Sequence, residues 1–259
     1  MDLRFGLSRS HGGERILDGA RLLTEVLGSV IGSRVRLQVA FDYNDLLRAL
    51  FAGTVDVAWL APMALAQAHH QGVHVVGVCE RNTRLSYHSA LLVRDDAPAH
   101  GPAELGEIRA AWVEKSSASG YFFPRLHLQR HGVRFASETF AGTFAQGCAL
   151  VERGEADVCA MFAHSDQPTP PAGSRLRVLT VTEAIPNDGV VLSPQLTTTM
   201  QARLGNALLN LHTSEAGQRA METLFQAPRL VAPTAAVVAA IVELWKLIAP
   251  STTKATQRS

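Results

Sequence analysis

A loop of small hydroxyl residues offers the clearest binding chemistry in the sequence. Ser116-Ser117-Ala118-Ser119-Gly120 lies between a short apolar strand at residues 110–113 and a helix that begins near Tyr121. A strand that leads through such a loop into a helix leaves backbone N–H groups without intrahelical partners, and the serine hydroxyls add further donors. The positive end of the helix dipole lies at the same point. The pattern therefore predicts a site that binds a small anion without lysine or arginine.

A purely structural interpretation of these serines is also open. Serine is a preferred N-cap residue, so the loop could serve only to begin the helix.

The sequence contains none of the common catalytic motifs. GxSxG, HExxH, GxxxxGK[ST] and GxGxxG are absent, and the serine loop lacks the lysine of a phosphate-transferring P-loop. His127 and His131 stand four residues apart, but no HExxH glutamate accompanies them, so we expect no zinc site. We also expect no catalytic residue and no cofactor. An enzyme on this chain would depend on isolated groups, for which the candidates are Asp188, Glu114, His88 and Cys148.

Composition and charge argue against several classes of protein. The 259 residues include 24 Lys+Arg and 23 Asp+Glu, for a formal net charge of +1, which argues against a nucleic-acid-binding protein. Hydrophobic residues make up 47%, as in folded soluble proteins, and no apolar run reaches transmembrane length. The three cysteines, Cys79, Cys148 and Cys159, form no CxxC pair, so we expect buried free thiols rather than disulfides or a zinc site.

The beginning of the chain bears on its compartment. Met1-Asp2 leads directly into the apolar segment Leu3–Leu7, without a basic n-region, an apolar h-region or a small-residue cleavage site. The sequence as written therefore predicts a cytoplasmic protein, and a periplasmic one if the chain is a trimmed mature form.

Strands and helices alternate along the first part of the chain. The pattern predicts strands at residues 3–7, 35–40, 56–60 and 73–79, with helices at 14–27, 45–51 and 63–70 between them. Gly28 is expected to end the first helix. This alternation predicts an α/β fold with largely parallel strand pairing.

An internal repeat predicts two similar lobes. The same pattern occurs in Leu46–Leu60 and in Cys148–Phe162. It predicts an apolar helix that ends at a glycine, followed by x-x-Asp-Val and an apolar strand. The glycine, aspartate and valine recur at an offset of 101 residues. A chance likeness of two ordinary αβ units is the alternative. Two strand-like connections suggest a two-segment hinge with lobe I at residues 1–87 plus 191–259, lobe II at 88–190, and a ligand cleft between them.

Several short segments together resemble a known family. They are Leu3–Leu7, Asp42-Tyr43, Gly53–Pro62, Tyr87–Ser89, Ser117–Tyr121, Phe140–Gly142, Ala156–Val158 and Ile185–Asp188. In order and spacing, over about residues 3 to 240, the chain resembles the phosphonate, phosphite and phosphate substrate-binding proteins of ABC importers. The resemblance implies the α/β, two-lobed type II periplasmic-binding-protein fold, with two mixed sheets flanked by helices.

The resemblance also implies a ligand site. Ser117 and Ser119 would donate to the anion, Tyr43 and Tyr87 would supply phenol donors or walls, and Asp188 would accept from a protonated oxygen or an amine. The other residues carried over are Ala118, Gly120, Tyr121, Thr143 and Phe144.

Two of these positions depart from the family pattern. Ala118 stands where the family usually has threonine, and Thr143-Phe144 stands where it often has Ser-His. A lost hydroxyl and a lost imidazole make the predicted pocket less polar, which leaves the identity of the ligand open.

Three functions follow as expectations. The first is non-catalytic binding of a small oxyanion by hinge closure. The closed state would be recognised by an ABC permease or, in a cytosolic sensor, by a regulator. The second is an enzyme of small-molecule biosynthesis on the same fold. The third is an interaction domain without a small ligand. We expect a monomer that binds a small anionic ligand, contacts no nucleic acid and does not insert into a membrane.

Overall fold

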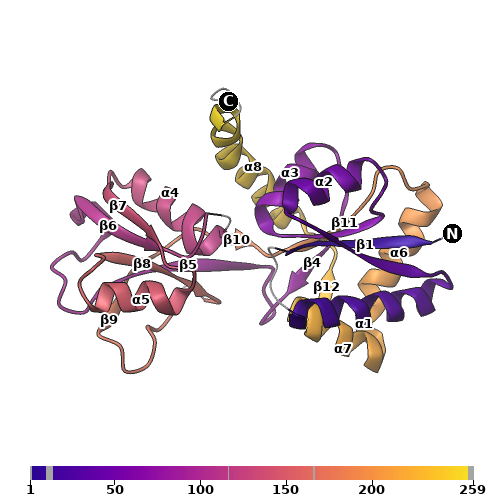
Figure 1. Ribbon diagram of the computed structural model, residues 1–259, viewed down its shortest axis with the longest axis horizontal. Helices are drawn as coiled ribbons and strands as arrows, with labels where there is room; N and C mark the ends of the chain where they lie inside the picture. Colours follow the sequence, from indigo (N-terminus) through magenta and orange to yellow (C-terminus); the bar gives the residue numbers. More distant parts are fainter. Residues whose placement is uncertain (1, 10–13, 116, 166, 256–259) are drawn as a thin grey trace. The chain divides into compact units, whose positions relative to one another are not determined.

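The computed structural model describes residues 2–9, 14–115, 117–165 and 167–255 (Figure 1). Ser116, a member of the predicted serine loop, lies outside the described residues. Two compact units make up the chain: unit 1 comprises Met1–Leu85 and Pro186–Ser259, and unit 2 comprises Ser86–Ile185. The predicted lobe limits at 87/88 and 190/191 lie a few residues beyond these boundaries.

Unit 1 is built on a six-stranded sheet in the order β12-β4-β11-β3-β1-β2. Its strands are β1 (Leu3–Ser8), β2 (Val35–Ala40), β3 (Val57–Leu60), β4 (Val75–Glu80), β11 (Gly189–Leu192) and β12 (Arg229–Val231). Strand β1 pairs in parallel with β2 and β3, whereas β11 is antiparallel to β3 and β4. The carboxyl ends of β1 to β4 therefore lie at the same edge as the start of β11.

Helices cover both faces of this sheet (Figure 1). They are α1 (Glu14–Ile31), α2 (Tyr43–Phe51), α3 (Pro62–His70), α6 (Thr198–Asn210), the short η4 (Leu211–Thr213), α7 (Glu215–Phe225) and α8 (Ala235–Ala255). Helices α1 and α7 lie side by side on one face, where Leu23, Leu27 and Leu224 join the apolar core. Helices α2 and α3 cover the other face, and α8 packs against α3. No helix in the described ranges combines the length and the hydrophobicity needed to cross a lipid bilayer.

The first helix is longer than predicted. Gly28 does not end α1, because Leu27 and Ile31 are both buried in the core and extend the helix by another turn. The chain turns instead at Gly32, which has the left-handed φ of +57° that favours glycine.

Unit 2 contains the sheet β10-β5-β8-β6-β7, with β9 also paired to β5. Its elements are β5 (Ser86–Arg94), η2 (Pro102–Glu104), β6 (Glu107–Trp112), η3 (Ala118–Phe122), α4 (Phe123–Arg130), β7 (Arg134–Phe140), α5 (Phe144–Glu152), β8 (Val158–Ala163), β9 (Leu176–Val181) and β10 (Ile185–Pro186). Strand β6 is parallel to β7 and β8, whereas β5 is antiparallel to β8.

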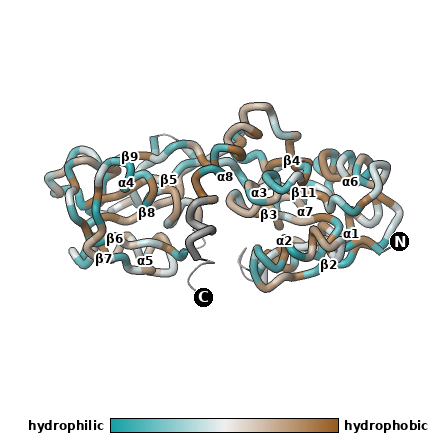
Figure 2. Tube along the Cα trace, turned by 90° about the horizontal axis from the view of Figure 1, so that it is seen from above, coloured by the Kyte–Doolittle hydropathy of each residue, from teal (hydrophilic) through white to brown (hydrophobic). Residues whose placement is uncertain are grey.

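Each face of the sheet in unit 2 has its own apolar cluster. Leu128 of α4 packs with Trp112 and Leu91 in one cluster, and Val151 of α5 packs with Leu92 and Cys159 in another. Figure 2 shows hydrophobic stretches along β5, β8 and β11, whereas hydrophobic and hydrophilic residues alternate along α6. This is the pattern expected when helices cover a buried sheet.

The internal repeat recurs in three dimensions. In unit 1 the backbone N–H of Arg4 donates to Asp56 Oδ2 (2.8 Å), and the N–H of Asp56 donates to the carbonyl of Arg4 (2.9 Å). In unit 2 Arg109 and Asp157 exchange the same two bonds, at 2.7 and 2.8 Å. Each arginine side chain also forms an ion pair with its aspartate. The segments α2–β3 and α5–β8 therefore share one construction.

Candidate functional site

In unit 2, most of the predicted site residues lie at one edge of the sheet. The parallel strands β6, β7 and β8 all end there, and the antiparallel strand β5 begins there. The segment Ser117–Tyr121 follows β6, Thr143 and Phe144 follow β7, and Tyr87 is the second residue of β5. The carboxyl edge of parallel strands is where ligands bind in open α/β sheets.

The serine loop forms a capped helix start. The Ser117 hydroxyl accepts a hydrogen bond from the backbone N–H of Gly120 (2.9 Å), and the Ser117 carbonyl accepts from the N–H of Phe122 (3.0 Å). The second bond gives a single π-helical turn, η3, before α4 begins. Such turns are rare and often occur at functional sites. The N-cap interpretation is therefore correct for Ser117, and it does not exclude a binding role for the turn.

Several donors of this turn remain available. Among the described residues, the backbone N–H groups of Ala118 and Ser119 have no hydrogen-bond acceptor, and neither does the Ser119 hydroxyl. No acidic side chain lies in the first turn of η3 or of α4. The positive end of the helix dipole is therefore not neutralised by a neighbouring carboxylate on the helix itself.

Buried contacts keep the serine loop in place. Ser89, fully buried in β5, donates its hydroxyl to the Ser119 carbonyl (2.7 Å), and the N–H of Val113 donates to the Gly120 carbonyl (3.0 Å). A Cβ atom on Gly120 would lie only 2.6 Å from Val113 Cβ and from Ser117 Oγ. The loop conformation therefore requires glycine at this position. This role of Ser89 is not predictable from sequence, because a single serine in an apolar strand has no local pattern that identifies it.

Two of the predicted tyrosines take part in aromatic packing within unit 2. The ring of Tyr121 packs edge-on against Trp112 and Phe140, with centroid distances of 5.9 and 5.2 Å. Tyr87 stacks on Phe162 at 4.8 Å. Tyr121 thus helps to anchor the helix start, and both side chains remain half-buried.

The start of α5 provides a second capped helix at the same edge. Thr143 is its N-cap and accepts from the backbone N–H of Gln146 (3.2 Å). Phe144 is the first helical residue and is half-buried, and no acidic residue lies in the first turn. A threonine followed by phenylalanine leaves this helix start uncharged.

Unit 1 presents an equivalent edge. Tyr43 is the first residue of α2, after the N-cap Asp42, whose carboxylate accepts from the N–H of Asp45 (2.8 Å). Because Tyr43 and Phe144 are 101 residues apart, they occupy matching positions in the repeated unit. The structure thus distributes the predicted site residues over the carboxyl edges of both sheets.

Asp188 lies at this edge of unit 1 within a network that the sequence did not predict. Its carboxylate accepts two bonds from the Arg81 guanidinium (2.6 and 3.1 Å), one from Trp59 Nε1 (2.6 Å) and one from the Cys79 thiol (3.0 Å). Burial acts to raise the pKa of Asp188, but Arg81 and the other donors outweigh it and lower that pKa below its ordinary value. Burial and the Asp188 charge both raise the pKa of Cys79.

These partners change the interpretation of Asp188. The predicted role, acceptance from a ligand oxygen or amine, would compete with four donors already bound to the carboxylate. We therefore leave Asp188 out of the proposed site and assign it to the structure of unit 1.

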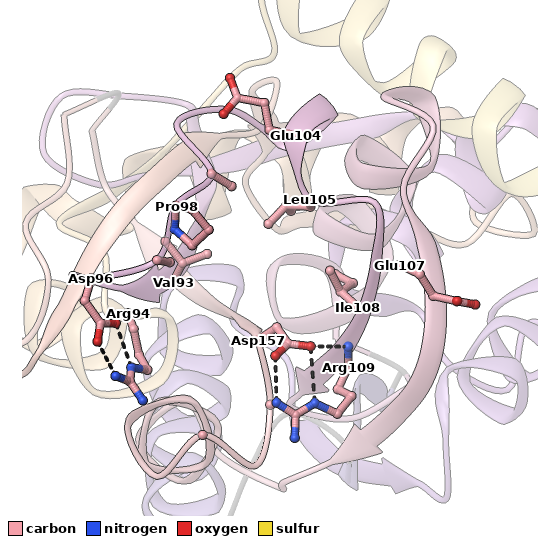
Figure 3. Close-up of a pocket in the computed structure, with 14 residues that line it drawn as sticks. Val93, Arg94, Asp96, Pro98, Glu104, Leu105, Glu107, Ile108, Arg109 and Asp157 are labelled. Atoms are coloured by element: carbon pink, nitrogen blue, oxygen red, sulfur yellow. Dashed lines mark hydrogen bonds and ion pairs between the residues drawn. The ribbon is translucent and has the colours of Figure 1, made fainter.

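A cavity of about 540 Å³ lies at the opposite, amino edge of the sheet in unit 2 (Figure 3). Figure 3 shows two ion pairs at its wall, Arg94 with Asp96 and Arg109 with Asp157. The apolar part of the wall includes Val93. Because this cavity lies at the opposite edge of the sheet from the serine loop, it is separate from the predicted site.

Comparison with known proteins agrees with this architecture. A family profile described as "ABC transporter, phosphonate, periplasmic substrate-binding protein" matches residues 5–237. The phosphate-import protein PhnD of Mycolicibacterium smegmatis is 25% identical over 150 residues, which are 52% of this chain and 47% of that protein. The matched part thus spans about half the length of this curated relative.

Two solved structures share the fold. XAC2383 from Xanthomonas citri bound to ATP has a TM-score of 0.82 at 20% identity, covering 96% of this chain and 97% of that one. PhnD1 from Prochlorococcus marinus in complex with methylphosphonate has a TM-score of 0.69 at 19% identity, covering 95% and 97%. These similarities confirm the predicted type II periplasmic-binding-protein fold.

The family profile also confirms the resemblance noted from the short segments, and its members are binding proteins rather than enzymes. Since it matches nearly the whole length, from residue 5 to residue 237, the chain belongs to the family of periplasmic substrate-binding proteins of phosphonate ABC transporters.

Proposed function

We propose that the protein binds a small phosphorus oxyanion, of the phosphate, phosphite or phosphonate type, at the Ser117–Gly120 turn of unit 2. The single observation that supports this most is the helix start itself. Its Ala118 and Ser119 N–H groups and the Ser119 hydroxyl have no acceptor among the described residues, and its first turn contains no carboxylate. Such a cluster of donors at the positive end of a helix favours an anion.

The neighbouring residues support selectivity for an anion with a small substituent. Ala118 and Phe144 stand where the family pattern usually has polar residues, Ala118 within the turn and Phe144 at the start of α5 at the same edge of the sheet. An oxyanion with one apolar substituent, such as methylphosphonate, would match this combination. Its oxygens would accept hydrogen bonds from the buried donors, and its substituent would contact the apolar side chains.

The family resemblance extends the proposal to unit 1. Tyr43, at the carboxyl edge of its sheet, would contact the same ligand, with Tyr87 contributing from unit 2. A ligand that contacts both units only in a closed form shifts the equilibrium toward that form by its difference in affinity. In the proposed role the closed form delivers the ligand to the permease of an ABC importer. The family description and the phosphate-import relative support this role.

Isothermal titration calorimetry tests the proposal directly. The wild-type protein is titrated with phosphate, phosphite, methylphosphonate and sulfate, and with acetate as an unrelated anion. We expect binding of at least one phosphorus oxyanion and loss of that binding in the Ser117→Ala, Ser119→Ala double variant.

A matched variant separates binding from folding. Ser214 is the N-cap of α7 in unit 1 and accepts from Gly217 N–H (3.1 Å), so Ser214→Ala removes the same kind of cap elsewhere. The Ser214→Ala variant should lower the free energy of unfolding by about 1 kcal/mol without changing the affinity for the anion. Unchanged affinity in the double serine variant would disprove the proposed anion site, and the absence of binding by every anion would favour the interaction-domain alternative.

A further inference from the structure

Two cysteine thiols meet between a helix and the sheet of unit 2. Cys148 lies on α5 and Cys159 on β8, and the distance between their Sγ atoms is 3.7 Å. Neither forms a disulfide in the structure. The two sulfurs are therefore neighbours, and this distance exceeds a disulfide bond length of about 2 Å by less than about 2 Å.

The surroundings of the pair are apolar and fixed. Cys159 pairs along the sheet with Leu92 on one side and Ala111 on the other, so β8 is held from both sides. Val151 of α5 belongs to the same apolar cluster. Each thiol therefore faces the other, and the cluster around them is hydrophobic.

The two thiols differ in access and acidity. Cys159 is fully buried, whereas Cys148 keeps 7% of its surface exposed. Donation by the Cys159 thiol lowers the pKa of Cys148, although burial and the negative charge of Glu152 both oppose this. The same bond, together with burial, raises the pKa of Cys159 well above its ordinary value. Cys148 is thus the better initial nucleophile, because the thiolate is the reactive form.

We propose that Cys148 and Cys159 are a modification site that forms a reversible intramolecular disulfide on reaction with a low-molecular-weight disulfide. The Cys148 thiolate attacks one sulfur of the small disulfide, which forms a mixed disulfide and releases one thiolate. The Cys159 thiolate then attacks Cys148 Sγ, which closes the protein disulfide and releases the second thiolate. The two protons lost by the cysteines convert the released thiolates to thiols, so the protein is oxidised by two electrons and the small disulfide is reduced.

The bond would join α5 to β8. Helix α5 begins at Phe144, after its N-cap Thr143, at the carboxyl edge, and its other end leads through Gly154 into β8. A bond across this short segment limits the freedom of the unfolded chain, which stabilises unit 2 in the oxidised state.

Peptide mapping of the native protein tests the proposal. The protein is incubated with glutathione disulfide, free thiols are then alkylated under denaturing conditions, and the digest is analysed by mass spectrometry before and after reduction. We expect a linked Cys148–Cys159 peptide that disappears on reduction, with Cys79 recovered in alkylated form. Cys79→Ser serves as the matched control, since Cys79 is also buried but lies in unit 1, and this variant should still form the linked peptide.

A stability measurement provides a second readout. The oxidised wild-type protein should melt a few degrees above the reduced one, and this difference should vanish in Cys148→Ser. Recovery of both Cys148 and Cys159 in alkylated form after native oxidation, or linkage mainly through Cys79, would overturn the proposal. The wild-type peptide map decides the matter even if a serine variant fails to fold.

Discussion

At the scale of single residues, the largely buried carboxylate of Asp188 shows how one side chain organises its surroundings. Arg81 pairs with it and also donates to the carbonyl of Gln226 (3.3 Å), so one guanidinium joins the end of β4 to the segment after α7. The side chains of Arg81 and Asp188 are 20% and 13% exposed, and the pair is therefore only weakly screened by water.

Removal of this arginine should be costly. Arg81→Ala leaves the Asp188 carboxylate without its positive partner in a largely buried position, and we expect the free energy of unfolding to fall by about 3 kcal/mol. Urea denaturation measures the change. The exposed pair Arg21–Asp18 gives the control, because Arg21→Ala should cost less than about 0.5 kcal/mol. Equal losses in the two variants would contradict a structural role for Arg81.

Gly120 gives a second prediction at this scale. In Gly120→Ala the new Cβ would lie 2.6 Å from Val113, so the loop must shift, and we expect a loss of about 1–3 kcal/mol in stability together with weaker anion binding. Denaturation and calorimetry measure the two effects. Gly101→Ala is the matched control in unit 2, since no atom lies within 4 Å of its added Cβ. Normal binding by Gly120→Ala would show that the loop geometry is not needed for the ligand.

At the scale of secondary-structure elements, His127 of helix α4 contacts both β9 and the segment that follows it. His127 Nδ1 lies 3.4 Å from Glu183 Oε2, and His127 Nε2 lies 3.5 Å from Thr180 Oγ1. The imidazole is buried, and burial lowers its pKa, although Glu183 acts in the opposite direction. The neighbouring His131 Nδ1 lies 2.8 Å from the His127 carbonyl oxygen.

This histidine should make stability depend on pH. Because the pKa of His127 is lower in the folded than in the unfolded protein, its contribution is fully present above the unfolded pKa of about 6.5 and is lost as pH falls below it. We expect a lower free energy of unfolding at pH 5 than at pH 7.5, and a smaller difference in His127→Gln. His100→Gln, the same substitution at an exposed histidine, is the matched control. If the free energy of unfolding of His127→Gln depended on pH as strongly as that of the wild-type protein, His127 would not be the group responsible.

The repeated αβ unit explains why binding groups recur at this scale. Asp42 and Thr143 cap α2 and α5 in the same way, each accepting from the N–H three residues later. Tyr43 and Phe144 follow these caps at matching positions. At this position unit 1 has the phenol of Tyr43, whereas unit 2 has the apolar ring of Phe144. The carboxyl edges of the two sheets therefore differ in polarity at this point.

At the scale of the whole molecule, the chain passes between the two units twice, at Leu85/Ser86 and at Ile185/Pro186. Asn187 joins these passages on the side of unit 1, where its N–H donates to the Leu85 carbonyl (2.9 Å) and its side chain donates to the carbonyls of Cys79 and Arg84. Two neighbouring connections of this kind suit a hinge, because they restrict the motion to few directions.

Ligand binding should therefore make the molecule more compact. We expect the radius of gyration from small-angle X-ray scattering to fall when the preferred oxyanion is added to the wild-type protein, since the proposed function requires the ligand to favour a closed form. The Ser117→Ala, Ser119→Ala variant should show no change. An unchanged radius in wild-type protein that binds the anion by calorimetry would contradict closure while leaving the anion site intact.

Tyr43 tests whether unit 1 contributes to the proposed site. Tyr43→Phe removes only the phenol hydroxyl, and loss of a hydrogen bond to a charged ligand should weaken binding by about tenfold or more. Calorimetry with the same anion measures the loss, and thermal denaturation should show that folding is retained. Full affinity in both Tyr43→Phe and Tyr43→Ala would remove Tyr43 from the site.

Several features were predictable from sequence because they are local. The cap at Ser117 depends on a residue three positions away, and the alternation of strands and helices depends on short apolar periods. The repeat is visible in the sequence because the backbone has a positive φ at both Gly53 and Gly154, just before x-x-Asp-Val. A positive φ favours glycine, so the same backbone geometry requires the same residue in both copies. These local rules, together with the resemblance, were sufficient for the fold class and for the serine turn.

The tertiary structure alone decided the partners of the remaining groups. Asp188 is bound by Arg81 and Trp59, which lie 107 and 129 residues away, and Cys148 meets Cys159 only because α5 packs on β8. The end of α1 was misplaced for the same reason, since burial of Ile31 extends the helix past Gly28. Contacts between distant segments depend on how whole elements pack, and a pattern within a few residues contains no information about that packing.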